Sequence, residues 1–178
     1  MPPLFRSAPT TQMTTPENFV QLFENVKARF DQRPQHGLVC RSGFHKNGSV
    51  LKLQKASWTN DSMDGMQNTS GIFFSVWINE ASIRKNRANY NIHALKLRHL
   101  NGYAITSRDF ANNFRTAFAT SAGKWPNVGV DYGPLTLMEG WIAINPDSLE
   151  NDILALMNQF GRLSPLIDRL LDSRRINN

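Results

Sequence analysis

The sequence has few of the features that mark secreted or membrane-spanning proteins. Among its 178 residues is one cysteine, so the chain forms no internal disulfide. Its longest apolar run, residues 72–78, is far shorter than the ~20 residues that a membrane-spanning helix needs. The N-terminal residues include no apolar stretch of secretory length, so no signal peptide is expected. These absences favour a cytoplasmic protein with no membrane partner.

The sequence signatures of common enzyme and metal sites are also missing. The four histidines are scattered, no second cysteine accompanies Cys40, and no His-x₃-His pair occurs, so no zinc site is predicted. A Gly-x-Ser-x-Gly motif and a glycine-rich phosphate loop are both absent. A single cysteine on an apolar strand is typically a small buried hydrophobic residue. We therefore predict no metal and no cofactor, and we identify no catalytic residue.

What the chain does have is enough apolar material for one core. Hydrophobic residues make up 40% of the sequence, including four Trp and eleven Phe. A chain of this length buries roughly 70% of the surface that its unfolded form exposes. We predict a single domain over residues 16–174, preceded by a disordered arm over residues 1–15, which contains several prolines.

The first half of this domain begins with a helix and continues with strands. Apolar residues at helical spacing predict a helix over residues 16–32. Residues 37–45 and 49–58 are predicted to form a hairpin that turns at Asn47-Gly48, a dipeptide that readily supplies two positive φ angles.

Two more strands follow a polar loop. The run at 71–80 is rich in β-branched and aromatic residues, and its alternation predicts one buried face. Residues 81–88 are predicted to be a basic connection. A fourth strand is predicted over 89–99, with Tyr90, Lys96 and Arg98 on the same face.

The second half contains helices and one more strand. Ser107 is predicted to cap a helix, and residues 135–144 to form a strand. A capping box at Asp147-x-x-Glu150 is predicted to open a last helix, which breaks at residues 161–165 and is followed by a short one. The order predicts an α+β fold: an antiparallel sheet of about five strands, with an N-terminal helix, a middle helix and C-terminal helices packed on it.

The positive charge is concentrated in one segment. The whole chain has a formal net charge of +6. Residues 84–124 contain eight basic residues and one acid, a local net charge of +7, so the remainder is nearly neutral. These eight are Arg84, Lys85, Arg87, Lys96, Arg98, Arg108, Arg115 and Lys124.

This basic segment predicts the function. Cations that contact phosphates, aromatic rings that stack on bases and asparagine amides together are typical of a nucleic-acid-binding face. We predict a non-enzymatic domain that binds an anionic partner, most plausibly nucleic acid, with Tyr90 or Tyr103 stacking. The predicted binding residues are Arg84, Lys85, Arg87, Tyr90, Lys96, Arg98, Arg108 and Arg115.

A metal- or carboxylate-dependent enzyme, similar in type to a nuclease or hydrolase, is the first alternative. Asp61, Asp64 and Glu80 surround a strand in a way that would suit a divalent cation. A second carboxylate pair is Asp131 and Glu139, within a loop-rich stretch.

A protein-interaction or assembly module is the other alternative. The half-apolar fourth strand, or Leu163, Leu166 and Leu170 near the C-terminus, would then contact another chain or a second copy of this one. The passage 124–141, rich in aromatic residues and glycine, is a further place where a pocket is expected.

Overall fold

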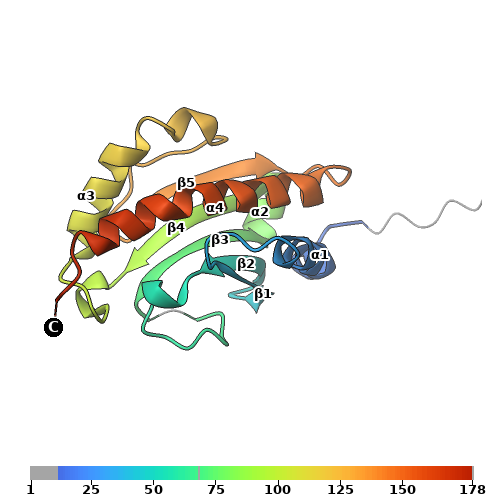
Figure 1. Ribbon diagram of the computed structural model, residues 1–178. Coiled ribbons are helices and arrows are strands. Elements are labelled where there is room, and N and C mark those ends of the chain that lie inside the picture. The colour runs from blue at the N-terminus through green and yellow to red at the C-terminus, as the bar shows by residue number, and fades with distance from the viewer. Residues whose placement is uncertain (1–11, 68, 178) are drawn as a thin grey trace, which may run out of the picture.

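A computed structural model describes residues 12–67 and 69–177. Most of the predicted N-terminal arm, residues 1–11, lies outside the described residues. The chain forms a five-stranded antiparallel sheet with helices packed on it, which confirms the predicted α+β fold (Figure 1). Its elements, with 3-10 helices written η, are η1 Pro16–Phe19, α1 Val20–Asp31, β1 Val39–His45, β2 Gly48–Gln54, η2 Ala56–Trp58, β3 Gly71–Asn79, α2 Glu80–Arg84, β4 Arg87–Leu95, η3 Leu97–His99, α3 Ser107–Phe118, η4 Ala122–Lys124, β5 Thr136–Ala143 and α4 Leu149–Asp172.

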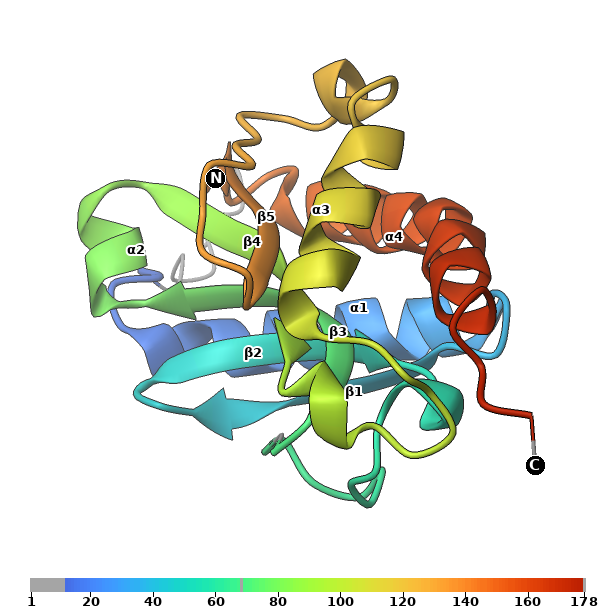
Figure 2. The same ribbon diagram turned by 90° about the vertical axis from the view of Figure 1, so that its left-hand side faces the viewer.

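The sheet has its strands in chain order, and the core lies between one face of it and the helices. α1 packs on β1 and β2 and also contacts α4, and Figure 2 shows α1 behind β2 and β3. As the alternation of β3 predicts, Ile72, Phe74, Val76 and Ile78 are all buried on this face. Phe74 stacks on Phe160 of α4, with ring centroids 4.5 Å apart. The helices therefore cover one face of the sheet and leave the other to the loops.

The predicted hairpin is present, but its turn lies one residue earlier than expected. Lys46 and Asn47 take the positive φ angles, 48° and 62°, and His45 pairs with Gly48. Gly48 belongs to β2 instead, where a Cβ atom would lie 3.0 Å from the carbonyl oxygen of Ile78. The close approach of β3 thus explains this glycine better than the turn does.

The structure refines the predicted connection before β4 and shifts the bounds of that strand from 89–99 to Arg87–Leu95. The connection over residues 81–88 contains a short helix, α2, whose N-terminus is capped by the Asn79 side chain accepting a hydrogen bond from the Ser82 amide at 2.9 Å. β4 ends at Leu95 because Lys96 adopts a left-handed conformation, with φ 46°. Lys96 and Arg98 therefore lie outside the sheet rather than on a strand face.

α3 begins one residue earlier than its predicted cap implies. Thr106, not Ser107, is the N-cap residue, and its hydroxyl accepts a hydrogen bond from the Asp109 amide at 3.1 Å. Phe110, Phe114 and Phe118 form the buried side of the helix, as their spacing predicts.

α4 runs unbroken through Pro165, against the predicted break at residues 161–165. Proline has no N–H to donate to the carbonyl four residues back, which here belongs to Gly161. The buried Ser164 hydroxyl donates to that carbonyl instead, at 2.8 Å. The predicted capping box is also absent, since Ser148 is the N-cap residue and its hydroxyl donates to Asp152.

The C-terminal part of α4 completes the core. Leu163, Leu166 and Leu170 are partly buried against it. In the part of the chain that the structure describes, no helix has the length and apolar character needed to cross a bilayer.

Candidate functional site

The sheet face turned away from α1 and α4 has a row of polar residues running across all five strands. Each member of this row lies directly opposite the next in the strand register. We call it the polar row: Arg41, Lys52, Ser75, Asn91 and Glu139. Residues that pair across antiparallel strands share a face, so the row forms a polar line on the face opposite the core.

Aromatic side chains flank the polar row on both sides. On one side Phe73 pairs with His93, and their rings are 5.2 Å apart. On the other side Trp77 and Trp141 both lie opposite Asn89 of β4. Trp77, Phe73 and Trp141 are each only partly buried. The open face therefore presents aromatic rings next to hydrogen-bonding groups.

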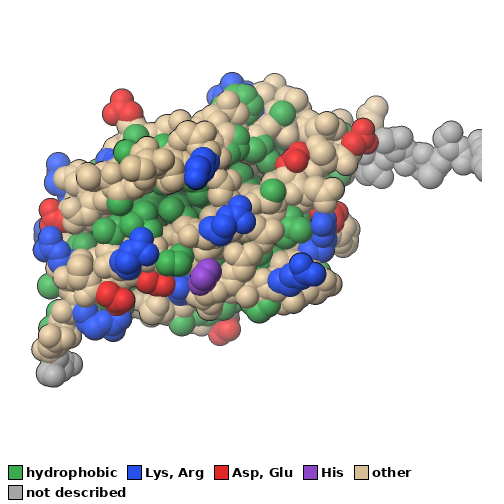
Figure 3. Space-filling model, turned by 45° about the horizontal axis from the view of Figure 1, so that its top comes forward, with side chains coloured by type: hydrophobic (Ala, Val, Ile, Leu, Met, Phe, Trp, Pro, Cys, Tyr) green, Lys and Arg blue, Asp and Glu red, His purple; other side chains and the backbone are tan. Residues whose placement is uncertain are grey.

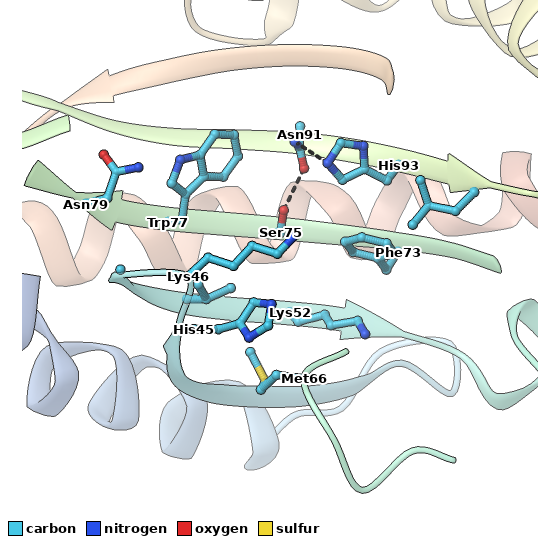
Figure 4. A pocket seen from close by; sticks show the side chains of 13 residues that line it. His45, Lys46, Lys52, Met66, Phe73, Ser75, Trp77, Asn79, Asn91 and His93 are labelled. Carbon is cyan, nitrogen blue, oxygen red and sulfur yellow. Dashed lines mark hydrogen bonds between the residues drawn. The ribbon is translucent and has the colours of Figure 1, made fainter. Parts of the chain in front are cut away.

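A cavity of about 460 Å³ lies over this part of the face (Figure 4). Phe73, Trp77 and Met66 supply apolar walls, and Lys52 and Asn91 belong to its polar lining. Met66 comes from the loop after η2 and packs near Gly43 of β1. The cavity is thus bounded by β2, β3 and β4, by the end of the β1–β2 hairpin and by one loop.

Lys52 is the most unusual residue of the cavity. Lys52 is only 2% exposed, and its amine has no hydrogen-bond partner among the described residues. The amine lies 4.8 Å from the centroid of the Phe73 ring. Burial, with the positive charge of Arg41 adding to it and Asp61 opposing, lowers the pKa of Lys52 from 10.5 to about 7.

Arg41 holds the loop that forms one wall of the cavity. Its guanidinium donates to the carbonyl oxygens of Met63 and Gly65 at 2.6 and 2.7 Å, and to the side chain of Gln54 at 2.7 Å. Burial lowers the pKa of Arg41 from its ordinary value. This arginine was not predicted as a site residue, and it fixes the loop that carries Met66.

A short hydrogen-bond chain leads from the polar row to the edge of the sheet. The Ser75 hydroxyl donates to Asn91 at 2.6 Å, and the Asn91 amide lies 3.0 Å from Nε2 of His93. With Nε2 accepting this bond, Nδ1 of His93 carries the proton and faces the Leu135 carbonyl at 3.1 Å. Burial lowers the pKa of His93, which favours this neutral form. Both ring nitrogens are therefore occupied.

The basic residues predicted to bind nucleic acid do not form one face. Arg84, Lys85 and Arg87 lie at the start of β4, while Lys96 and Arg98 follow its end, beside Arg108 around a shallow hollow. Nine residues of strand separate the two groups by roughly 26 Å. On the face drawn in Figure 3, Lys and Arg side chains are dispersed among apolar and uncharged ones. Six of the eight basic residues predicted over 84–124 are thus divided between the two ends of β4.

Two of the predicted binding residues have structural roles instead. Tyr90 is fully buried on the helix side of β4 and its hydroxyl donates to the Pro126 carbonyl at 2.6 Å, so its ring cannot stack on a base. Arg115 donates to four backbone carbonyls, those of Tyr132 and Gly133 in the loop before β5 and those of Thr136 and Leu137 at the start of β5. Tyr103 is 8% exposed and lies beneath the Arg175 guanidinium.

The carboxylates of the enzyme alternative are not gathered into a metal site. Asp61 accepts hydrogen bonds from Thr69 within its own loop, which lower its pKa, and Glu80 pairs with Arg84 at 3.5 Å. Within residues 12–67 and 69–177, no three His, Cys, Asp or Glu side chains could hold a metal ion. Asp131 is exposed, and Glu139 ends the polar row.

Cys40 is not placed as a nucleophile either. It is 3% exposed, and burial raises the pKa of its thiol from 9.0 to about 12.

Comparison with protein-family models, curated proteins and solved structures finds no match to this chain. The function is therefore inferred from the geometry of the open face.

Proposed function

We propose that the protein is a non-enzymatic, cytoplasmic domain that binds an anionic partner, most plausibly single-stranded nucleic acid, on the open face of its sheet. The observation that carries the proposal is the placement of Phe73, Trp77 and Trp141 on the same uncovered face as basic side chains. Sheets that present aromatic rings beside cations bind single strands by stacking on bases and contacting phosphates.

The charges near these rings support the same proposal. The Arg87 guanidinium lies 4.0 Å from the centroid of the Trp141 ring, and Lys85 lines the same hollow. At the other end of the face, Lys46 is exposed in the hairpin turn. Arg87 and Lys85 are the two predicted binding residues that fit this surface best, so the proposed interface shifts from the 84–124 segment to the sheet.

Trp77 and Trp141 are spaced for unstacked bases. Both lie opposite Asn89, so they stand on strands two apart, about 10 Å from each other. Asn79 and Asn89 lie beside them with amide groups. We expect successive bases to stack on the two indoles, with phosphates near Arg87.

The test is fluorescence anisotropy with labelled 12-nucleotide single strands at 50 and 200 mM salt. We expect binding that weakens with salt, because phosphate contacts release counterions. Trp77→Ala should weaken binding about tenfold, since stacking on one base contributes about 1–3 kcal/mol. Phe44→Ala is the matched control, because Phe44 is an aromatic residue 46% exposed on the other face of β1.

Two outcomes would contradict the proposal. One is the absence of binding at 50 mM salt. The other is an equal loss in the Trp77→Ala and Phe44→Ala variants, which would mean that the open face is not the binding surface. Binding of a duplex as tight as that of the single strand would argue against base stacking.

A further inference from the structure

The amine of Lys52 is a buried donor with nothing in the described structure to accept its hydrogen bonds. Buried polar groups are normally paired, and leaving one unpaired costs free energy. Lys52 is one of the residues lining the cavity on the open face, next to Phe73 (Figure 4). The lining of the cavity therefore includes a buried donor that has no partner among the described residues.

The charged residues around the cavity indicate which charge a bound molecule should carry. Among the described residues that line it none is acidic, whereas His45, Lys46 and His93 line it together with Lys52. Arg41 adds positive potential from β1, and Asp61, in the loop before β3, is the acid that acts on Lys52. An acceptor with a negative charge is thus favoured over a neutral or cationic one.

We propose that this cavity binds a small organic acid, whose carboxylate accepts hydrogen bonds from the Lys52 amine and whose flat apolar body packs against Phe73, Trp77 and Met66. This inference is independent of the proposed nucleic-acid binding, because it requires only that one small molecule occupies the cavity. The apolar walls suit an aromatic or aliphatic body.

A carboxylate fits this site better than a phosphate group. A phosphate carries three strong acceptor oxygens and nearly two charges, and such groups are usually met by several donors. Among the described residues that line the cavity, Lys52 supplies the one buried donor without a partner, while the Ser75 hydroxyl and the His93 nitrogens are engaged in their own bonds. One unmatched donor and apolar walls correspond to one acidic group on an apolar body.

Binding should be coupled to protonation of Lys52. The carboxylate stabilises the charged amine, so affinity should fall up to about tenfold per pH unit above pH 7.5, until the pKa of the bound state is reached. Arg41 and Asp61 are the charged groups that act on Lys52, and hydrogen bonds to Asp61 hold its pKa below the ordinary value. His45, Lys46 and His93 also line the cavity, with Glu139 acting on His93, and burial lowers the pKa of His93 further below this range. The dependence between pH 7.5 and 9.5 thus reports on Lys52.

The experiment is isothermal titration of the full chain with 2-naphthoate and with its neutral analogue 2-naphthalenemethanol. We expect naphthoate to bind and Lys52→Met to weaken it about ten- to hundredfold, the usual effect of losing a hydrogen bond to a charged group. Lys124→Met is the matched control, because Lys124 is exposed on η4, away from the cavity. Circular dichroism checks that each variant folds.

Several outcomes would overturn the proposal. They are no naphthoate binding by the folded protein at millimolar concentration, equal binding of the neutral analogue, or unchanged affinity in Lys52→Met. Oligonucleotide titrations of the same samples keep the two proposals apart. If naphthoate binds and single strands do not, the nucleic-acid proposal fails while this one stands. If single strands bind and naphthoate does not, this proposal fails while the nucleic-acid proposal stands.

Discussion

The amine of Lys52 lies over the ring of Phe73, 4.8 Å from its centroid, on the neighbouring strand. The ring attracts the charged form of the amine, but it provides no hydrogen-bond acceptor. Burial therefore outweighs the ring, and the pKa of Lys52 falls to about 7. A buried amine without a hydrogen-bond acceptor therefore lowers the free energy of unfolding of the protein.

Lys52→Met should stabilise the protein at low pH and lose that advantage as the pH rises. The folded state holds the proton of Lys52 less tightly than the unfolded state, whose pKa stays near 10.5. The unfolded state thus binds more protons between about pH 7 and 10.5, and the stability of the natural protein rises with pH in that window. We expect the variant to have a free energy of unfolding about 1–3 kcal/mol higher at pH 6.

Urea denaturation at pH 6, 8 and 10 measures this difference. The gap between variant and natural protein should shrink from pH 6 to pH 10. A gap that stays constant over this range would show that Lys52 keeps an ordinary pKa in the folded protein. Lys124→Met should show no such trend.

Ser164→Ala should destabilise α4. The Ser164 hydroxyl is buried and donates to the Gly161 carbonyl that Pro165 leaves without its helical partner. Losing this bond leaves a buried acceptor unpaired, and we expect a loss of about 1–2 kcal/mol in the free energy of unfolding. Ser173 makes the same type of bond to Leu170 at 2.8 Å, but at the exposed end of the helix.

Ser173→Ala is therefore the matched control for Ser164→Ala. It should cost less than about 0.5 kcal/mol, because water can replace the lost hydroxyl. Urea denaturation of both variants gives the comparison. Equal losses would mean that the proline inside α4 does not depend on Ser164.

Arg115→Lys should loosen the loop before β5. A lysine ammonium cannot reproduce the planar fork through which the guanidinium contacts four carbonyls, so the exchange is not conservative. We expect a loss of about 2 kcal/mol in stability and faster hydrogen exchange in residues 127–136. Arg108→Lys, at an exposed position on the same helix, should change neither. Unchanged exchange in Arg115→Lys would contradict the structural role.

Cys40 should be unreactive in the folded protein. Burial raises the pKa of its thiol to about 12, so almost no thiolate is present at pH 8. A thiol reagent such as dithionitrobenzoate should react slowly with the native chain and within minutes in urea. Because the chain has a single cysteine, the signal is unambiguous. Fast reaction without urea would mean that the thiol is accessible.

Much of the secondary structure could be predicted because its signals are local. The alternation of Ile72, Phe74 and Val76 predicts the buried face of β3, and the spacing of Phe110 and Phe114 predicts that of α3. The same alternation places Phe73, Ser75 and Trp77 together on the other face, so half of the site was already visible in the sequence.

The wrong predictions share a different cause. Gly48 is required by contact with β3, and α4 continues past Pro165 because Ser164 supplies the missing bond. Both depend on where a neighbouring atom lies. In the same way, Lys96 leaves the sheet by a left-handed turn that its side chain does not signal.

The basic residues of the chain show the same difference between what is local in the sequence and what depends on the tertiary structure. Its sequence determined the fold class, most of the strands and helices, and a basic excess within residues 84–124. Only the tertiary structure decided that most of this excess divides between the two ends of β4. It alone also decided that one polar residue of each strand lines up across the sheet, namely Arg41, Lys52, Ser75, Asn91 and Glu139. Periodicity along one strand is a local property, whereas the register between strands depends on the packing of the whole core.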